Sequence, residues 1–330
     1  MQFPVTRLRR LRQSPAIRSL LTETRVLPEN LIAPIFLVPG SNIQNTISSM
    51  PEQFQLSTDK AIEKVKLLSD LGVKTILLFG IPEKKDDTCE SACADNGIVQ
   101  KSIAAIKSAV SGVTVATDLC FCEYTAHGHC GIMKGERLDN DATLEKLAKQ
   151  AVSHAKAGAD IIAPSGMIDG CVGTIRDGLD EAGFSDALVM GYSAKFASSF
   201  YGPFREAVNS APQFGDRKTY QMNSANLSEA MREIELDIEE GADIIMVKPA
   251  LAYLDVIHQA KKEYNMPTAA YNVSGEYAMI KLAAEKGLID GKRMMLETLT
   301  SIKRAGADII ISYFAEEFAK LYQSGKANDF

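Results

Sequence analysis

The sequence lacks any apolar run long enough to cross a membrane. A spanning helix needs about 20 predominantly apolar residues in succession, and no stretch of the chain approaches that length. The basic segment from Arg7 to Arg12 is not followed by the apolar core that a signal peptide requires. We therefore expect no membrane partner, and the cytoplasm is the expected location.

An excess of positive charge is missing as well. The 330 residues include 42 acidic and 36 basic side chains, which gives a net charge of −6 and a pI near 5.4. General nucleic-acid binding needs a basic surface, so we expect no nucleic-acid partner. The chain also has no G-x-G-x-x-G turn after its first predicted strand, which argues against a dinucleotide-binding fold.

Cysteine is too sparse for a disulfide scaffold, but it is unevenly distributed. Three of the six cysteines crowd the short segment from Cys120 to Cys130. Such crowding in a long chain indicates a metal site in a reducing compartment. We assign no role to the other three, Cys89, Cys93 and Cys171.

The sequence does contain a repeated phrase. Gly-Ala-Asp-Ile-Ile occurs at residues 158–162, 241–245 and 306–310, and residues 71–80 are a looser copy. Each copy follows an amphipathic helical pattern, has glycine where that helix would end, and runs into an apolar strand. A recurring helix–glycine–strand unit is typical of parallel β/α arrays.

Eight apolar segments are predicted to be strands, and helical patterns separate them. We expect strands at residues 31–37, 75–79, 113–119, 161–163, 187–190, 244–247, 268–271 and 309–312. We expect helices near residues 58–70, 97–110, 141–157, 172–182, 224–240, 252–264, 276–286 and 293–305, and another from residue 314. This alternation predicts a (β/α)8 TIM barrel, with an open doubly wound sheet as the alternative.

No linker or low-complexity tract divides the chain, so we predict one barrel domain over residues 31–330, preceded by an arm over residues 1–30. The arm is basic and is interrupted by Pro4, Pro15 and Pro28. It is either a frayed tail or an oligomerisation arm that packs on another subunit. Leucines among its arginines favour the second interpretation.

The active site of a barrel lies at the carboxyl ends of its strands. Polar or reactive side chains recur at these predicted ends, namely Asp118, Cys120, Ser165, Tyr192, Lys195, Lys248, Ser274 and Tyr313. This convergence indicates an enzyme more strongly than any one of the residues does.

Two of the predicted strand ends carry lysine. Lys248 closes the apolar run from Ile244 to Val247, and desolvation there favours the neutral amine, which can attack a carbonyl and form a Schiff base. Lys195 lies at the preceding strand end, and two neighbouring ammonium groups repel each other. The alternative is that Lys248 extends its side chain out to solvent.

The segment from Asp118 to Cys130 is the strongest local signal. Cys120, Cys122 and Cys130 can place three thiolates around one soft ion such as zinc, which leaves a fourth position open for water or substrate. His127 or His129 could instead complete a closed structural site.

A long segment rich in glycine, proline, serine and aromatic residues runs from Lys195 to Gln221, which is typical of an active-site lid. Arg205, Arg217 and Lys218 would place positive charge over the pocket, suited to a carboxylate. Each arginine could instead be a solvated surface residue.

Three long motifs resemble one family. Cys120-Phe121-Cys122 with Cys130, the run 193–196 leading into 200–205, and the run 246–249 are similar to porphobilinogen synthases, also called 5-aminolevulinate dehydratases. The similarity covers essentially the whole chain. It implies a (β/α)8 barrel that condenses two molecules of 5-aminolevulinate into the pyrrole porphobilinogen, with loss of two waters, on the route to haem and other tetrapyrroles.

The resemblance also implies roles for individual residues. Lys248 would form the Schiff base with the first substrate, and Lys195 would engage the second. Zinc at Cys120, Cys122 and Cys130 would polarise the second substrate through its open position.

Further matches concern the carboxylates, a second metal and the assembly. Arg205, Arg217 and Gln221 match binders of the second substrate's carboxylate, and Ser274 and Tyr313 match hydroxyls that hold that of the first. Glu233 falls where some members bind an activating magnesium ion remote from the active site. The usual assembly is an octamer of arm-hugging dimers, which would give residues 1–30 a function.

Two other classes are compatible with parts of the pattern. A class I aldolase would also use a barrel lysine, but it needs no thiolate metal site. A non-catalytic zinc-binding scaffold would explain the cysteines and leave both lysines unexplained.

Overall fold

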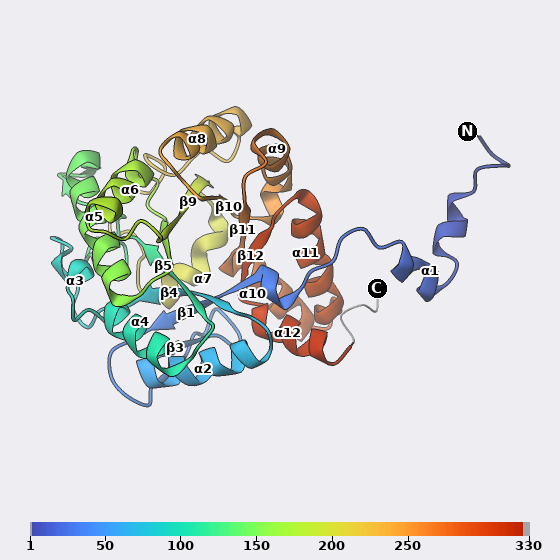
Figure 1. Cartoon of the computed structure of the whole chain (residues 1–330), viewed down its shortest axis with the longest axis horizontal. Coiled ribbons are helices and arrows are strands. Elements are labelled where there is room, and N and C mark those ends of the chain that lie inside the picture. The colour runs from blue at the N-terminus through green and yellow to red at the C-terminus, as the bar shows by residue number, and fades with distance from the viewer. Residues whose placement is uncertain (1, 326–330) are drawn as a thin grey trace.

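The computed structural model describes residues 2–325, and the chain folds around a closed barrel of parallel strands (Figure 1). The barrel strands follow one another in sequence order, and β12 pairs with β1 to close the ring. They are β1 (Leu31–Leu37), β4 (Thr75–Gly80), β5 (Thr114–Leu119), β8 (Ile161–Pro164), β9 (Leu188–Lys195), β10 (Ile244–Lys248), β11 (Thr268–Asn272) and β12 (Ile309–Ser312). The predicted (β/α)8 barrel is confirmed.

Helices surround the barrel, as the sequence predicts. The longer ones are α2 (Thr58–Asp70), α4 (Ile98–Ala109), α5 (Asn140–Ala157), α6 (Cys171–Glu181), α8 (Leu227–Glu239), α9 (Leu254–Tyr264), α10 (Ser274–Glu285), α11 (Gly291–Ala305) and α12 (Ala315–Gln323). Short helices are α1 (Pro15–Leu20), α3 (Glu90–Cys93) and α7 (Gly202–Ala207), with 3₁₀ turns η1 (Leu8–Arg12), η2 (Pro28–Asn30), η3 (Ser199–Tyr201) and η4 (Leu251–Tyr253). Among residues 2–325, no helix is long and apolar enough to span a membrane.

The aspartates of the repeated Gly-Ala-Asp phrase fix neighbouring strands at the amino end of the barrel. Each carboxylate accepts a hydrogen bond from a backbone N–H on the adjacent strand. The pairs are Asp160 with Val115, Asp243 with Val189, and Asp308 with Thr268, at 2.7, 2.8 and 2.9 Å. The preceding glycines have φ values of +106°, +98° and +127°, in the region that favours glycine. The repeat therefore sets strand register.

Four short strands lie outside the barrel and were not predicted. β2 (Gln44–Thr46) and β3 (Phe54–Leu56) form an antiparallel pair beside the end of β1. β6 (Met133–Lys134) and β7 (Arg137–Leu138) form a separate hairpin. None of these four segments is longer than three residues, and β2 is exposed along its whole length, so they give no apolar pattern in the sequence.

Strand β9 is longer than its apolar sequence predicts. The predicted strand ends at Met190, but β9 continues through Tyr192 to Lys195. Tyr192 is therefore inside the strand, and Lys195 is its last residue. Lys248 is likewise the last residue of β10, and the two lysines are register partners across the sheet.

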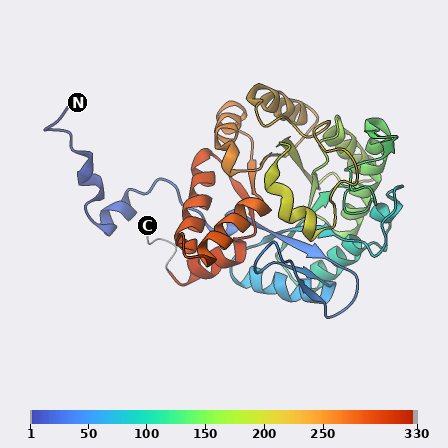
Figure 2. The same cartoon turned by 180° about the vertical axis from the view of Figure 1, so that it is seen from behind.

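The N-terminal segment projects from the barrel, as Figures 1 and 2 show from opposite sides. None of residues 2–25 is buried, although they contain η1 and α1. Val26 and Pro28 are the first buried residues, so contact with the barrel begins just before β1.

Candidate active site

Lys195 and Lys248 lie side by side in a cavity at the carboxyl ends of the strands. Each is only 5% exposed. The Lys195 ammonium donates to the backbone oxygen of Ser165. Burial lowers the pKa of Lys248, the charge of Lys195 adds to this effect, and together they bring the pKa to about 7. Near neutral pH a substantial fraction of the Lys248 amine is therefore unprotonated and nucleophilic.

Aromatic rings surround the Lys248 amine. Its Nζ atom lies 4.1, 5.0, 5.4 and 5.5 Å from the ring centroids of Tyr271, Tyr192, Phe204 and Tyr201, respectively. These rings come from β11, β9, α7 and η3. Their faces attract a cation, so the cage can accommodate both an amine and a positively charged iminium.

A buried carboxyl group faces the two lysines. Oδ2 of Asp118 accepts from the Ser165 hydroxyl at 3.0 Å, and Oδ1 has no hydrogen-bond partner in the described chain. Burial raises the pKa of Asp118 to about 6, against the opposing charges of Lys248 and Lys195. Asp118 can therefore exchange a proton near neutral pH.

The cavity brings together five of the seven residues expected to act on substrate, namely Lys195, Lys248, Arg217, Ser274 and Tyr313. Arg205 and Gln221 are not part of its lining. The Arg217 guanidinium is buried and donates to the backbone oxygens of Gly128 and Ser210 at 2.8 and 2.7 Å. Lys218 does not line the cavity, since its side chain is 77% exposed and lies beside Asp216.

The two expected carboxylate-binding hydroxyls are held by neighbouring elements. Ser274 Oγ donates to the backbone oxygen of Phe200 at 3.3 Å and accepts from the N–H of Phe204 at 3.0 Å. It therefore connects the start of α10 to the η3–α7 segment. The hydroxyl of Tyr313 lies 3.1 Å from that of Tyr271.

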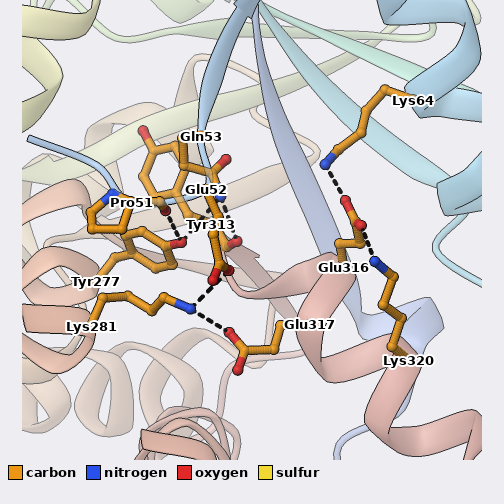
Figure 3. A network of polar contacts seen from close by, with 10 residues as sticks. All are labelled: Pro51, Glu52, Gln53, Lys64, Tyr277, Lys281, Tyr313, Glu316, Glu317 and Lys320. Carbon is orange, nitrogen blue, oxygen red and sulfur yellow. Dashed lines mark hydrogen bonds and ion pairs between the residues drawn. The ribbon is translucent and has the colours of Figure 1, made fainter. Parts of the chain in front are cut away.

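A polar network holds Tyr313 from outside the barrel (Figure 3). The Gln53 amide donates to the backbone oxygen of Tyr313 and to the Tyr277 hydroxyl, both at 3.3 Å. The Tyr277 hydroxyl donates to the backbone oxygen of Pro51 at 2.5 Å. Lys281 forms ion pairs with Glu52, in the loop before β3, and with Glu317 of α12, and so connects the two segments.

The three clustered thiols meet beside the cavity. The sulfur atoms of Cys120, Cys122 and Cys130 all lie within 4.8 Å of one another, and all three residues are buried. Thiols at this spacing can ligate one metal ion. Burial lowers the pKa of Arg217, but the cysteine charges outweigh that effect and raise it. Its fixed positive charge compensates thiolates.

Neither histidine of this loop closes the thiol cluster. The ring nitrogens of His129 contact the Tyr220 hydroxyl at 3.0 Å and the backbone oxygen of Phe214 at 3.1 Å. His127 accepts from the N–H of His129 and has its other nitrogen 3.8 Å from Asp87. Among the described residues, no histidine groups with the three sulfurs, so the alternative of a closed site is not supported.

Glu233 lies elsewhere, in a second cavity that it shares with Asp169, Ser193, Asp237 and Glu240. Burial raises its pKa, and the neighbouring charge of Asp169 adds to this effect. The remaining cysteines, Cys89, Cys93 and Cys171, are free thiols outside the thiol cluster.

Sequence reasoning missed several cavity residues. Asp118 and Ser165 stand at predicted strand ends, but the sequence assigns them no role, and it does not distinguish Glu123, Tyr201, Phe204 and Tyr271 from their neighbours. For Tyr271 a signal was available, because it ends the predicted strand 268–271. The Tyr201 and Phe204 rings lie near Lys248 only because the chain after β9 folds back over this strand end as η3 and α7.

The fold and site define a (β/α)8-barrel enzyme whose strand-end lysines are chemically able to form imines with carbonyl substrates. The family model described as delta-aminolevulinic acid dehydratase matches residues 5–321. The chain belongs to this family, whose members are hydro-lyases.

Known relatives match along nearly their whole length. Delta-aminolevulinic acid dehydratase of Synechococcus elongatus is 56% identical, covering 96% of this chain and 99% of that one. The Bacillus subtilis enzyme is 52% identical, with 97% and 99% covered. The crystal structure of the Toxoplasma gondii enzyme, also named porphobilinogen synthase, was solved with its reaction product porphobilinogen. It is 42% identical, has a TM-score of 0.94, and the match covers 97% of this chain and 91% of that one.

Proposed function

We propose that this protein condenses two molecules of 5-aminolevulinate into porphobilinogen with loss of two waters, as a step of tetrapyrrole (haem) biosynthesis. The observation that carries the proposal is the buried pair Lys195 and Lys248 at adjacent strand ends in one cavity. Two ketone substrates need two anchoring points. A neutral amine at Lys248 can attack the first ketone, and the aromatic cage stabilises the iminium that forms.

The surrounding residues divide between the two substrates. Ser274 and Tyr313 line the Lys248 cavity, and we assign their hydroxyls to the first carboxylate. We assign the second carboxylate to Arg217 and Arg205, whose guanidinium groups would donate charge-assisted hydrogen bonds, and to the neutral amide of Gln221. Oδ1 of Asp118 is available to accept and return protons.

The thiol cluster fits a zinc ion. Its three donors are soft, buried and mutually within 4.8 Å, and Arg217 supplies compensating charge. We propose that Cys120, Cys122 and Cys130 hold this ion. When bound, zinc would supply a Lewis acid that polarises an oxygen of the second substrate. A reducing compartment such as the cytoplasm suits these free thiols.

We also propose a magnesium role for Glu233 and an oligomerisation role for residues 1–30. Hard cations prefer carboxylate and water ligands, which the cavity around Glu233 can provide. Stimulation of activity by magnesium should disappear in Glu233→Ala and persist in Glu235→Ala, an exposed residue of the same helix. The arm carries exposed apolar side chains, including Phe3, Leu8 and Leu20, and we expect it to pack on a neighbour in an octamer.

The direct test is incubation with 5-aminolevulinate, followed by a pyrrole-specific colour reaction and mass spectrometry of the product. We expect porphobilinogen from the parent and none from Lys248→Ala. A class I aldolase would consume the substrate without forming a pyrrole, and a non-catalytic scaffold would leave it unchanged. Either outcome would overturn the proposal.

A further inference from the structure

Glu276 is a completely buried carboxyl group that the proposed chemistry does not use. It is the third residue of α10 and has 0% exposure. All of its hydrogen-bond partners are uncharged. Burying an acid without a cationic partner is costly, so the group is retained against a penalty, and its contacts indicate what it does.

The carboxylate joins the loops that follow two neighbouring barrel strands. One oxygen accepts from the backbone N–H of Leu251, after β10, at 2.8 Å. The other accepts from the Asn272 side-chain amide and from the N–H of Val273, at the end of β11, both at 2.9 Å. Glu276 thus fixes these two loops relative to each other.

Asn272 extends the connection to a third strand. Its side-chain oxygen accepts from the Ser312 hydroxyl at 2.9 Å, and the Ser312 oxygen accepts from the N–H of Phe314 at 3.1 Å. Asn272 and Ser312 are also fully buried. An unbroken chain of hydrogen bonds therefore crosses the carboxyl ends of β10, β11 and β12.

The three loops carry one substrate's proposed binding groups. Lys248 precedes Leu251 by three residues, Ser274 directly follows Val273, and Tyr313 lies between Ser312 and Phe314. Arg205 and Arg217, which we propose for the second substrate, lie in the segment from Lys195 to Gln221. They make no hydrogen bond with Glu276, Asn272 or Ser312.

We propose that Glu276, Asn272 and Ser312 form a positioning network for the first-substrate subsite. The network holds the Lys248 amine in register with the Ser274 and Tyr313 hydroxyls, so that one ketone acid contacts all three groups at once. This assignment rests on the proposed function. Errors of about 1 Å in such placement can cost about 100-fold in rate, and a fully bonded buried network is a means of avoiding them.

Two variants interrupt the network at different points. Glu276→Gln places an NH₂ group where the wild-type oxygens face N–H donors, so at least one contact is lost. Ser312→Ala removes the link between Asn272 and Phe314. Glu285→Gln is the matched control, because it makes the same chemical change at an exposed position of the same helix.

The probe is levulinate, which has the ketone and carboxylate but no amine and so cannot proceed to product. Imine formed with it is trapped by cyanoborohydride and quantified on the Lys248 peptide by mass spectrometry. For Glu276→Gln and Ser312→Ala we expect the half-saturating levulinate concentration to rise at least about tenfold, while Glu285→Gln matches the parent. The double variant should be less than additive because both changes break one chain.

A merely structural role would give a different result. It would lower the thermal unfolding midpoint but leave the trapping curve of the folded protein unchanged, and that result would overturn the proposal. If Glu276→Gln does not fold, Ser312→Ala decides. If no levulinate is trapped on Lys248 of the parent, the proposed function fails and this assignment fails with it. If the parent is trapped and both variants match it, only the positioning role is lost.

Discussion

Lys195 and Lys248 end adjacent parallel strands and lie side by side as register partners, 53 positions apart in the sequence. Adjacent parallel strands present their last side chains at the same edge. Aromatic rings from β9, β11, η3 and α7 surround Lys248 at this edge, and both lysine side chains are buried. One buried site therefore contains two groups that can react with carbonyl carbon.

We expect the two lysines to be chemically unequal. Borohydride added with 5-aminolevulinate should trap substrate chiefly on Lys248, which is held in the aromatic cage. Lys248→Ala should lose both trapping and turnover, by at least about 10³-fold in kcat. Lys195→Ala should lose turnover yet still be trapped at Lys248. Peptide mass spectrometry distinguishes the sites, and predominant trapping at Lys195 would reverse the assigned binding order.

The lowered pKa of Lys248 predicts a pH dependence of imine formation. Attack requires the neutral amine. The initial rate at which levulinate forms a trappable imine on Lys248 should therefore increase with pH around a midpoint near 7 and then level off. Rapid-quench measurements between pH 5.5 and about 9 would show this. A midpoint near the usual lysine value would mean that burial does not control this amine.

The same shift predicts a stability effect with a defined sign. The folded protein binds the Lys248 proton with a pKa of about 7, against an ordinary lysine pKa of 10.5. Between these values the unfolded chain binds more protons, so this lysine's contribution to the free energy of unfolding rises with pH. Lys248→Met should therefore be more stable than the parent near pH 7. Denaturant unfolding should show the difference in free energy of unfolding between Lys248→Met and the parent decreasing toward pH 10.5. A difference that is constant with pH would contradict this explanation.

Much of the fold could be predicted because the deciding signals are local. Strands β8, β10 and β12 are apolar runs that each follow a Gly-Ala-Asp phrase, and parallel strands are buried on both faces. The polar end of β9 lacks that signal, so the sequence pattern places Tyr192 and Lys195 after the strand instead of within it. Pairing with β10 extends the strand, and that is a tertiary effect.

The site could be predicted where reactive residues end apolar strands, as for Lys248, or cluster in the sequence, as for Cys120 and Cys122. Its electrostatics could not. The acidity of Asp118 depends on burial and on two lysines from other strands. Glu276 looks like an ordinary residue in the first turn of a helix, and only the folded chain shows that it joins two loops.

The cysteines should divide into two functional groups. Cys120→Ser, Cys122→Ser and Cys130→Ser should each lower bound zinc, measured by inductively coupled plasma mass spectrometry, and remove most activity. A strong chelator should act likewise on the parent, with recovery on zinc and reductant. The paired change of Cys89 and Cys93 to Ser is the control. It can cost about 1–3 kcal/mol of stability at buried Cys89 but should retain the metal. Full activity in a verified zinc-free preparation would contradict the assignment.

The last prediction concerns the arm. No residue from 2 to 25 is buried in the single chain, although several of them are large and apolar. Phe3, Val5, Leu8 and Leu20 are each at least 65% exposed. Exposed apolar side chains on one projecting segment indicate a partner surface. Deletion of residues 1–25 should therefore give smaller species in sedimentation velocity and lower activity. The paired change of Leu8 and Leu11 to Asp should weaken assembly in the same direction, whereas Arg9→Gln, which removes a charge but no apolar contact, should have little effect. Because residues 2–25 contribute no buried side chain to the barrel, the far-ultraviolet circular dichroism of the remaining chain should stay that of a folded barrel. An assembly of unchanged size after deletion would return residues 1–30 to a solvated tail.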